Sequence, residues 1–584
     1  MHIKLVQIHN YRNFSNFEIS FSSGFQTIVG ENNVGKSNFY RAIRLVLDKT
    51  MSHKERTLEE KDFHRYSITG PDSFIAVSMT FYGEDLASFP NFHAIKTSDN
   101  SARITYVFAH KDHFRETDAT ERSAAIKDFK FSLFGGGDSM VLEDLVQLGQ
   151  ISLGTIEGIH LYYITAFRNI FSDLHGREKS LLSQYCLSRN TAEEELRQVN
   201  EIMEASSQRL NALPFVPEIS DGIRQVSTRI AGQQYSLPIS LSFQTDFEAD
   251  SWNQLNLFFN PNPTSKIPVG VLGLGQKNIL YLSLFLSRLI QERDAHELNV
   301  LLIEEPEAHL HPQLQKILFS NLSNLENTQV FMTSHSTHIA SDCEFKNLNV
   351  IHLDLGGNVR SNSPFSNSCL TPRESLLLKR YLDATRSELF FASGVILVEG
   401  VAEQFIVPAI AKAVYSMNLT EHNISTIPIH SRQFAPFMKL FQVGQFEIPV
   451  ATIIDGDISE ISEDDDETNA VAAARTLSVP GRVEVFSGTH TLELDLFPNK
   501  EINQNFLKRT FEGLGHGKSF QNLIQCSPDE WHGGLISRIE ERVGKGRFSQ
   551  ELALHLDRTF VVPQYVADAI RFIARCRGIN ATPQ

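Results

Sequence analysis

The first 50 residues alternate between apolar and polar positions before they change to a helical spacing. Ile3–Ile8 and Phe17–Phe21 alternate with period two, and Phe25–Val29 is a short apolar run that stops at Gly30. In Asn38–Leu47, apolar residues recur every three or four positions. These periods predict two half-buried strands, a buried strand, a glycine-bounded loop and a helix, in that order.

The same reading extends along the chain and predicts an α/β protein. Further strands are expected at 73–83, 103–109, 159–165, Leu237–Phe243, Leu255–Phe259, Val300–Ile303 and Val330–Thr333, with helices at Leu280–Leu289 and Pro312–Leu325. Residues 176–232 have long helical periodicity and many charges, which predicts an inserted helical arm. A second α/β block starts near Ser393. We therefore expect four segments, namely 1–175, 176–232, 233–390 and 391–584.

Composition excludes several classes of protein. The chain has 584 residues, of which 41% are hydrophobic and 21% charged, as in an ordinary globular protein. Its five cysteines lie far apart, which fits a reducing cytoplasm better than a disulfide framework or a zinc finger. The polar first residues predict no signal peptide, and no run of about 18 apolar residues predicts a membrane span. The net charge of −16 neither supports nor excludes a nucleic-acid partner.

The segment Gly30–Ser37 (GENNVGKS) fits the phosphate-binding pattern G-x-x-x-x-G-K-S between a strand and a helix. Glycines let backbone N–H groups wrap around phosphates, and the helix N-terminus adds a partial positive charge. Lys36 is expected to bridge the β- and γ-phosphates of ATP, and Ser37 to ligate Mg²⁺. We assign Gly30, Asn33, Gly35, Lys36, Ser37 and Asn38 to nucleotide binding.

Two carboxylates follow the buried strand Val300–Ile303. Ligands of open α/β sheets bind at the carboxyl ends of the strands, so Glu304 is predicted to hold Mg²⁺. Glu305 is predicted to orient or deprotonate the attacking water. Without the phosphate-binding loop, an acidic strand end before a solvated helix would explain both residues equally well.

Two further segments complete this first set of motifs. Gly275 and Gln276 lie in a glycine-rich segment that opens a helix, which is either an anion-binding helix end or a simple cap. His335 follows the strand Val330–Thr333, where it either contacts the γ-phosphate or is an ordinary loop histidine.

The order of these motifs resembles that of ABC-type ATPases of the SMC, RecF and OLD kind. The resemblance implies that Gly275 and Gln276, a degenerate signature, act on the nucleotide of a second subunit, and that His335 is the switch histidine. The segment Glu307–Pro312 resembles the D-loop of that family, although His309 and His311 also allow a metal pair. The family reading implies at least a dimer, with 176–232 as the dimerisation segment.

The second α/β block carries a different set of acidic residues. The strand Val395–Val398 ends at Glu399, with Glu403 four residues on, and Pro449–Ile454 is followed by Asp455 and Asp457. Two parallel strand ends bring these carboxylates together, and they cannot all stay ionised without cations. Oxygen ligands select Mg²⁺, Mn²⁺ or Ca²⁺ over zinc.

This second block resembles a Rossmann-like Toprim domain, and its E-x-x-x-E spacing is typical of OLD-family nucleases. The resemblance implies that Glu493 and Asp495 supply carboxylates to a second metal and that Lys545 stabilises charge on the scissile phosphate. A structural salt bridge or a solvated loop is the alternative for both segments. The resemblance to OLD-family proteins extends over nearly the whole chain. It implies an ABC ATPase in two parts, 1–175 and 233–390, followed by a Toprim domain at 391–584. The tail is similar to the class found beside a UvrD-like helicase, which includes Gabija nucleases.

The sequence thus predicts an ATP-binding, metal-dependent DNA endonuclease of the bacterial cytoplasm, for defence against phage or foreign DNA. Its expected partners are DNA, further copies in a dimer or tetramer, and a UvrD-like helicase, with no membrane. Glu399, Asp455, Asp457, Lys545 and Glu305 are the expected catalytic residues. One alternative is a RecF- or SMC-like repair ATPase with a regulatory Toprim domain. The other is a topoisomerase or primase. A type II topoisomerase needs a catalytic tyrosine, and Tyr565 has no identifiable arginine partner for that role.

Overall fold

The computed structural model describes residues 1–581 except for several segments. The exceptions are 65–69, 71, 85, 87–91, 115–124, 166–204, 236–237, 244–254, 261–266, 269–270, 293–296, 363–369, 384, 431–432 and 457–465. Asp457, one of the predicted metal ligands, and residues 176–204 of the predicted arm therefore lie outside the described residues.

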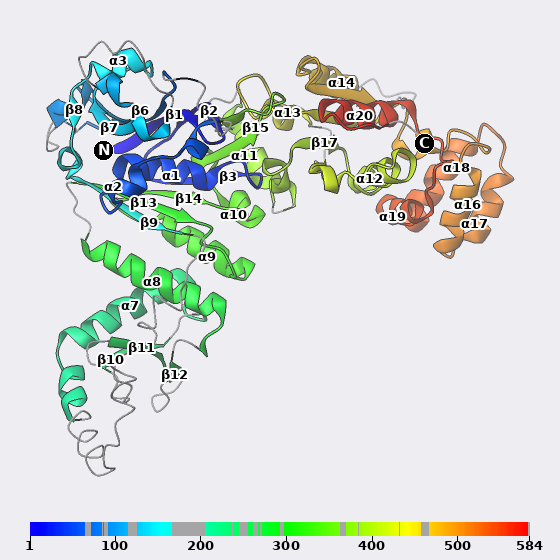
Figure 1. Ribbon diagram of the computed structural model, residues 1–584. Coiled ribbons are helices and arrows are strands. Elements are labelled where there is room, and N and C mark those ends of the chain that lie inside the picture. Colours follow the sequence, from blue (N-terminus) through cyan, green and yellow to red (C-terminus); the bar gives the residue numbers. More distant parts are fainter. Residues whose placement is uncertain are drawn as a thin grey trace, which may run out of the picture.

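The N-terminal part holds an antiparallel sheet with the strand order β2-β1-β4-β6-β7-β8. Its strands are β1 (His2–Tyr11), β2 (Phe14–Ser20), β4 (Ile75–Tyr82), β6 (Ser101–His110), β7 (Phe129–Gly135) and β8 (Gln150–Ile151), with β5 (Lys96–Ser98) paired to β6. Alternate residues of β1, including Val6 and Ile8, are buried, as the period-two pattern predicts. This sheet lies over α1 (Lys36–Leu47) in Figure 1.

A second sheet lies on the other side of α1 and has the order β16-β15-β3-β14-β13-β9. All neighbouring strands in it are parallel except β16, which is antiparallel to β15. The strands are β3 (Phe25–Gly30), β9 (Ile159–Ile164), β13 (Leu298–Glu304), β14 (Gln329–Thr333), β15 (Leu348–Leu353) and β16 (Val359–Asn362). Every residue of β3, β13 and β14 is buried, which explains their continuous apolar runs.

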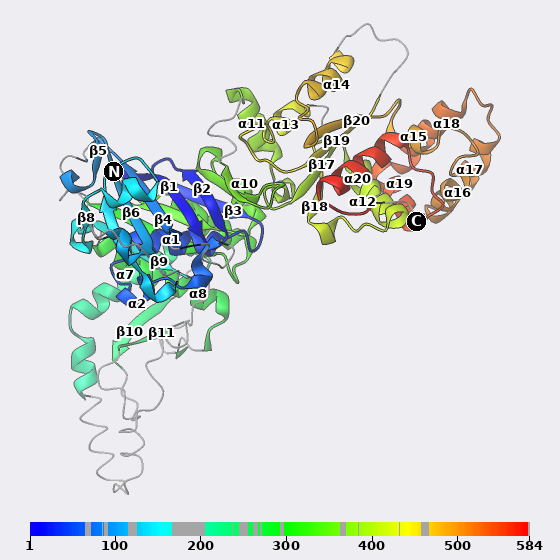
Figure 2. The same ribbon diagram turned by 45° about the horizontal axis from the view of Figure 1, so that its top comes forward.

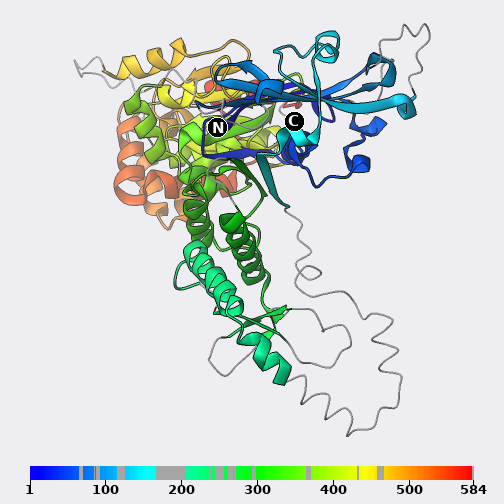
Figure 3. The same cartoon turned by 90° about the vertical axis from the view of Figure 1, so that its left-hand side faces the viewer.

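An arm projects from this second sheet, as Figure 3 shows. It contains α7 (Phe215–Ala231), α8 (Leu274–Glu292) and the small sheet β10 (Ile239–Phe243), β11 (Leu255–Phe259) and β12 (Ile267–Pro268). The helix α9 (Pro312–Ser323) contacts α7 at the base of the arm. The helix α8 begins at Leu274, six residues before the predicted start at Leu280. The glycines at 273 and 275 are poor helix formers, so the sequence pattern did not show these first residues as helical.

The C-terminal unit is built on a parallel sheet with the order β18-β17-β19-β20. Its strands are β17 (Gly394–Val398), β18 (Ile424–Pro428), β19 (Val450–Ile454) and β20 (Val483–Ser487). The helices α12 (Val401–Tyr415) and α20 (Gln564–Cys576) pack on it. Figure 2 shows α16 (Gln504–Gly513), α17 (Gly517–Ile524), α18 (Trp531–Arg538) and α19 (Lys545–His555) beyond one end of this sheet. The predicted α/β class is confirmed for both units.

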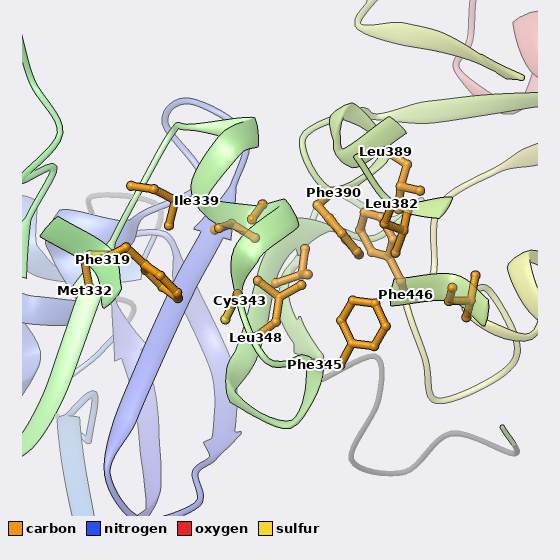
Figure 4. Packing of buried hydrophobic residues seen from close by; sticks show 14 of the residues in the cluster. Phe319, Met332, Ile339, Cys343, Phe345, Leu348, Leu382, Leu389, Phe390 and Phe446 are labelled. Atoms are coloured by element: carbon orange, nitrogen blue, oxygen red, sulfur yellow. The ribbon is translucent and has the colours of Figure 1, made fainter. Parts of the chain in front are cut away.

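One hydrophobic core joins the two units. It contains Leu348 and Val350 of the second sheet together with Leu397 and Val450 of the C-terminal sheet. Figure 4 shows the residues between them, where Phe345 and Leu348 face Leu382, Leu389, Phe390 and Phe446. The ion pair between Glu374 of α11 (Pro372–Tyr381) and Lys439 of α13 (Ala435–Lys439) lies in the same region, with Nζ 2.8 Å from Oε1. No helix in the described part of the chain is long and apolar enough to cross a membrane.

Candidate functional site

The predicted phosphate-binding loop connects β3 to α1 and is held in shape by two glycines. Gly35, the residue before α1, has a φ of 108°, a left-handed conformation that glycine adopts without strain. A Cβ atom on Gly35 would lie 2.0 Å from Nδ2 of Asn13, so a larger residue would have to displace that side chain. Asn33, with a φ of 63°, and Ser37 are exposed on the outside of this loop.

Lys36 is buried and folds back over the loop. Its Nζ donates hydrogen bonds to the carbonyl oxygens of Gly30, at 2.7 Å, and Glu31, at 2.8 Å. Burial lowers the pKa of Lys36 to about 8, although Glu305, Glu31 and Glu307 oppose this shift. A bound phosphate would offer the same ammonium a stronger acceptor than these carbonyls.

The turn between β1 and β2 supports the loop from outside. Nδ2 of Asn13 donates to the Val34 carbonyl, and its Oδ1 accepts from Nδ2 of Asn38 at 2.8 Å. Arg12 donates from Nη1 to Oδ1 of the same Asn38 at 2.6 Å, and its Nε lies 2.8 Å from Oδ1 of Asp62. Arg12 and Asn13 lie in the turn that joins the paired strands β1 and β2, and this pairing brings them beside the loop.

Glu304 and Glu305 stand at the end of β13, which is separated from β3 by β14. Glu304 is buried and accepts a hydrogen bond from the Tyr163 hydroxyl at 3.1 Å. Glu305 has a φ of 43°, and its Oε1 lies 3.3 Å from Nε2 of His335. Burial and the nearby Lys36 lower the pKa of His335, against the pull of Glu305. The parallel sheet thus brings the loop, both carboxylates and His335 to one edge.

The start of α8 lies against the segment that follows β13. Nδ2 of Asn278 donates to the carbonyls of Pro306, at 3.0 Å, and Ala308, at 2.9 Å. A Cβ atom on Gly275 would lie 2.7 Å from the His309 carbonyl oxygen, so the backbones approach closely here. The side chain of Gln276 is exposed.

A second group of acidic residues lies where β17 and β19 end. These strands are adjacent and parallel, and the backbone N–H of Asp455 donates to Oε1 of Glu399 at 3.1 Å. Glu403, in the first turn of α12, accepts from the Gly400 N–H at 2.9 Å. Burial, with Glu403, Glu399 and Glu493, raises the pKa of Asp455 to about 9. The strand ends thus form one electrostatically coupled group of carboxyls.

Glu493 and Lys545 reach this group from later in the chain. Glu493, in α15 (Leu492–Leu496), is almost fully buried, and neither carboxylate oxygen has a hydrogen-bond partner. Nζ of Lys545, at the start of α19, is 3.3 Å from Oε2 of Glu493 and 3.4 Å from Oε1 of Glu540. Burial lowers the pKa of Lys545, but these two glutamates outweigh it and leave the pKa raised.

Tyr565 and Asp495 also lie near this group. The Tyr565 hydroxyl is buried without a hydrogen-bond partner, and burial with the nearby Asp455 raises its pKa. Both side chains pack against Gly488. A Cβ atom on Gly488 would lie 2.3 Å from Oδ2 of Asp495 and 3.0 Å from Cζ of Tyr565. The side chain of Asp495 accepts from the Thr489 hydroxyl at 3.0 Å. The sequence already placed Asp495 in the same segment as Glu493, whereas only the tertiary contacts bring Tyr565 to this group.

The donor set of this group fits a hard divalent cation. The buried Glu493 carboxylate, which has Lys545 beside it but accepts no hydrogen bond, and the Asp455 carboxyl, whose pKa is raised by its neighbours, would both be stabilised by a further positive charge. Among the described residues, no three aspartate, glutamate, histidine or cysteine side chains are already arranged around one point. The predicted ligand Asp457 is outside that set.

Two sequence families match this chain. The AAA ATPase domain matches residues 1–135 and 150–340, more than half of the chain, and the OLD-like (overcoming lysogenization defect protein-like) TOPRIM domain matches residues 390–457. Endonuclease GajA of Bacillus cereus (strain VD045) is 20% identical over 411 residues, which cover 69% of this chain and 66% of that protein. OLD nuclease of Thermus scotoductus is 21% identical over 420 residues, with 69% and 72% covered.

Other matches are shorter. Endonuclease GajA of Bacillus cereus (strain HuB5-5) is 25% identical over 229 residues, and the chain spans only 32% of its length. The solved C-terminal region of the Xanthomonas campestris pv. campestris OLD protein is 28% identical and covers 32% of this chain and 98% of that one, with a TM-score of 0.26. The expected resemblance to the OLD family is confirmed by the TOPRIM family match and by the two longer sequence matches. The chain belongs to the AAA ATPase domain family and carries an OLD-like TOPRIM domain behind its ATPase domain.

Proposed function

We propose that this chain is an ATP-binding, divalent-metal-dependent DNA endonuclease. The observation that carries the proposal is the coupled group of Glu399, Glu403, Asp455 and Glu493 at one edge of the C-terminal sheet, with Lys545 beside it. The relatives named as endonucleases support the same activity. A repair ATPase with a regulatory TOPRIM domain would need no such buried group.

In this proposal, Glu399, Glu403, Asp455, Glu493 and Asp457 hold the metal. Oxygen ligands favour Mg²⁺, Mn²⁺ or Ca²⁺. Bound there, such a cation lowers the pKa of water and offsets the charge of the phosphate backbone, which the carboxylates alone would repel. Lys545 is close enough to Glu493 to remain protonated and to present its ammonium to a phosphodiester.

The nucleotide site is separate. Lys36 and the backbone of Gly30–Ser37 hold the phosphates of ATP, with Asn33 and Asn38 beside them. Ser37 and Glu304 are the Mg²⁺ ligands, and Glu305 orients the attacking water with His335 at its side. Gly275 and Gln276 serve the nucleotide of a second subunit, which requires at least a dimer, or a tetramer, with 176–232 in the interface.

The biological setting belongs to the same proposal. We place the protein in the bacterial cytoplasm, in defence against phage or foreign DNA, with a UvrD-like helicase as its partner. Light scattering of the full chain, with and without ATP, should give a mass of at least two subunits at micromolar concentration. A single-subunit mass under all these conditions would contradict the dimer.

The decisive experiment is cleavage of supercoiled plasmid by the full chain with Mg²⁺ or Mn²⁺, with and without ATP. Asp455→Ala should lower the cleavage rate by about 100-fold or more, because losing a metal ligand costs several kcal/mol of the barrier. Phosphate release from ATP should be unchanged. Asp568→Ala, which alters an exposed aspartate of α20, is the matched control and should cut normally. If Asp455→Ala cuts as fast as the unmodified chain, the regulatory TOPRIM alternative is the better account.

A further inference from the structure

Glu307 is a buried carboxylate between two motifs of the nucleotide site. It lies three residues after Glu304 and is 8% exposed. Its Oε1 accepts two hydrogen bonds, from the Ser334 hydroxyl at 2.6 Å and from the backbone N–H of His335 at 2.9 Å. Both donors belong to the segment after β14. A single oxygen therefore fastens the ends of two neighbouring strands to each other.

The backbone on either side of Glu307 is itself held in place. Asn278 of α8 donates to the carbonyls of Pro306 and Ala308, the two neighbours of Glu307. The position of Glu307 is thus set by α8, which begins at Leu274. The imidazole of His335 is not buried to the same extent, since 34% of its side chain is exposed. His335 is held by the hydrogen bond from its backbone N–H to Glu307 and by the 3.3 Å contact of its imidazole with Glu305.

We propose that Glu307 is a positioning residue that places His335 for ATP hydrolysis. This inference rests on the proposed ATPase activity of the site and adds a residue to it. A carboxylate oxygen accepts two strong hydrogen bonds at once and thereby fixes both the Ser334 side chain and the His335 backbone. Alanine at 307 leaves the buried Ser334 hydroxyl and the partly buried His335 N–H without this acceptor and frees the segment that carries His335.

A double-mutant cycle in the full chain tests whether Glu307 acts through His335. The four proteins are the unmodified chain, Glu307→Ala, His335→Ala and the double variant. ATP turnover gives kcat, and titration with a fluorescent ATP analogue gives the Kd. Glu307→Ala should lower kcat by up to about 100-fold, the effect of a displacement near 1 Å, with the Kd changed by less than about threefold. In the His335→Ala protein, adding Glu307→Ala should lower kcat by less than about threefold.

Two milder variants keep the test valid if Glu307→Ala does not fold. Glu307→Gln keeps an oxygen acceptor of similar size and should recover most of kcat. Ser334→Ala removes one of the two donors and should lower kcat only in part. An equal loss of kcat from Glu307→Ala with and without His335 would overturn the proposal, as would a loss confined to the Kd.

Hydrogen exchange separates this inference from the proposed activity. The His335 amide should exchange at least about tenfold faster in Glu307→Ala, because its acceptor is gone. Unchanged exchange would overturn the link between Glu307 and His335 whatever the turnover. If the unmodified chain shows the expected exchange but never hydrolyses ATP, the ATPase proposal fails instead.

Discussion

At the scale of single residues, Lys36 decides whether the first site is a nucleotide site. Its ammonium is buried and held by two loop carbonyls that a phosphate can replace. We expect Lys36→Ala to weaken ATP binding by at least about tenfold, since a charge-assisted hydrogen bond contributes about 1.5–3 kcal/mol. Titration with a fluorescent ATP analogue measures this. Lys61→Ala, which removes an exposed lysine, is the control and should bind normally. Equal affinity in both variants would remove Lys36 from the site.

Tyr565 allows a residue-scale test of the second site without metal. Its hydroxyl is buried and has no hydrogen-bond partner. Tyr565→Phe should therefore leave the free energy of unfolding unchanged or raise it by up to about 1 kcal/mol in the metal-free chain. Tyr106→Phe is the contrast, because the Tyr106 hydroxyl donates to the carbonyl of Arg56. That change should cost about 1 kcal/mol. Urea unfolding compares the two, and a larger loss in Tyr565→Phe would reveal a partner for its hydroxyl.

At the scale of secondary-structure elements, the contact between β3 and β15 sets the geometry of the phosphate-binding loop. A Cβ atom on Gly30 would lie 2.0 Å from the carbonyl oxygen of Ile351, and Gly30 has a φ of 151°. Gly30→Ala must push the strands apart, so we expect a loss of about 1–3 kcal/mol in stability together with weaker ATP binding. Gly24→Ala is the control, because its φ is 81° but its Cβ would meet nothing within 4 Å. Thermal unfolding should then show a larger loss for Gly30→Ala than for Gly24→Ala.

A similar close approach fixes the acidic edge of the C-terminal sheet. A Cβ atom on Gly456 would lie 1.9 Å from the carbonyl oxygen of Gly488. The Gly456 N–H also donates to the His490 carbonyl at 3.1 Å, and the Gly488 N–H to that of Ile454 at 3.1 Å. The loops after β19 and β20 therefore touch backbone to backbone. This contact holds Asp455 and Asp495 in fixed relative positions.

At the scale of the whole molecule, His352 reports on the junction between the two units. It lies on β15, is 1% exposed, and meets the ring of Phe446 edge-on at 5.0 Å between centroids. Burial lowers the pKa of His352 to about 4, against the opposing charges of Glu447 and Asp354. In the unfolded chain its pKa is about 6.5. The unfolded state therefore binds the extra proton first, and stability falls as the pH drops from 6.5 towards 4.

His352→Phe should remove this part of the acid sensitivity. At about 1.4 kcal/mol per pKa unit, the full pKa shift corresponds to about 3 kcal/mol of folding stability. The unmodified chain should lose this stability between pH 6.5 and 4, whereas the variant should not. Urea unfolding at pH 7 and pH 5 measures the difference. Parallel loss of stability in both proteins would show that His352 is not buried as described.

The sequence by itself determined the local features of this protein. The period-two pattern located β1 and β2, the apolar runs located β3, β13, β17 and β19, and the spacing in Gly30–Ser37 identified the phosphate-binding loop. These signals are readable because they depend on the burial of neighbouring residues in one strand or helix. The family resemblance then predicted an ATPase unit followed by a TOPRIM unit, which the family matches confirm. The assigned site residues stay predictions.

Only the tertiary structure decided which distant residues meet. The sequence could not place Asn13 against Gly35 or Glu307 against His335, because each contact depends on strand order and on how separate loops pack. The sequence also could not show that one core joins the two units, since an apolar residue does not indicate which other residues it will pack against. The hydrophobic effect is non-directional, so the pattern of the chain says what is buried, and only the fold says against what.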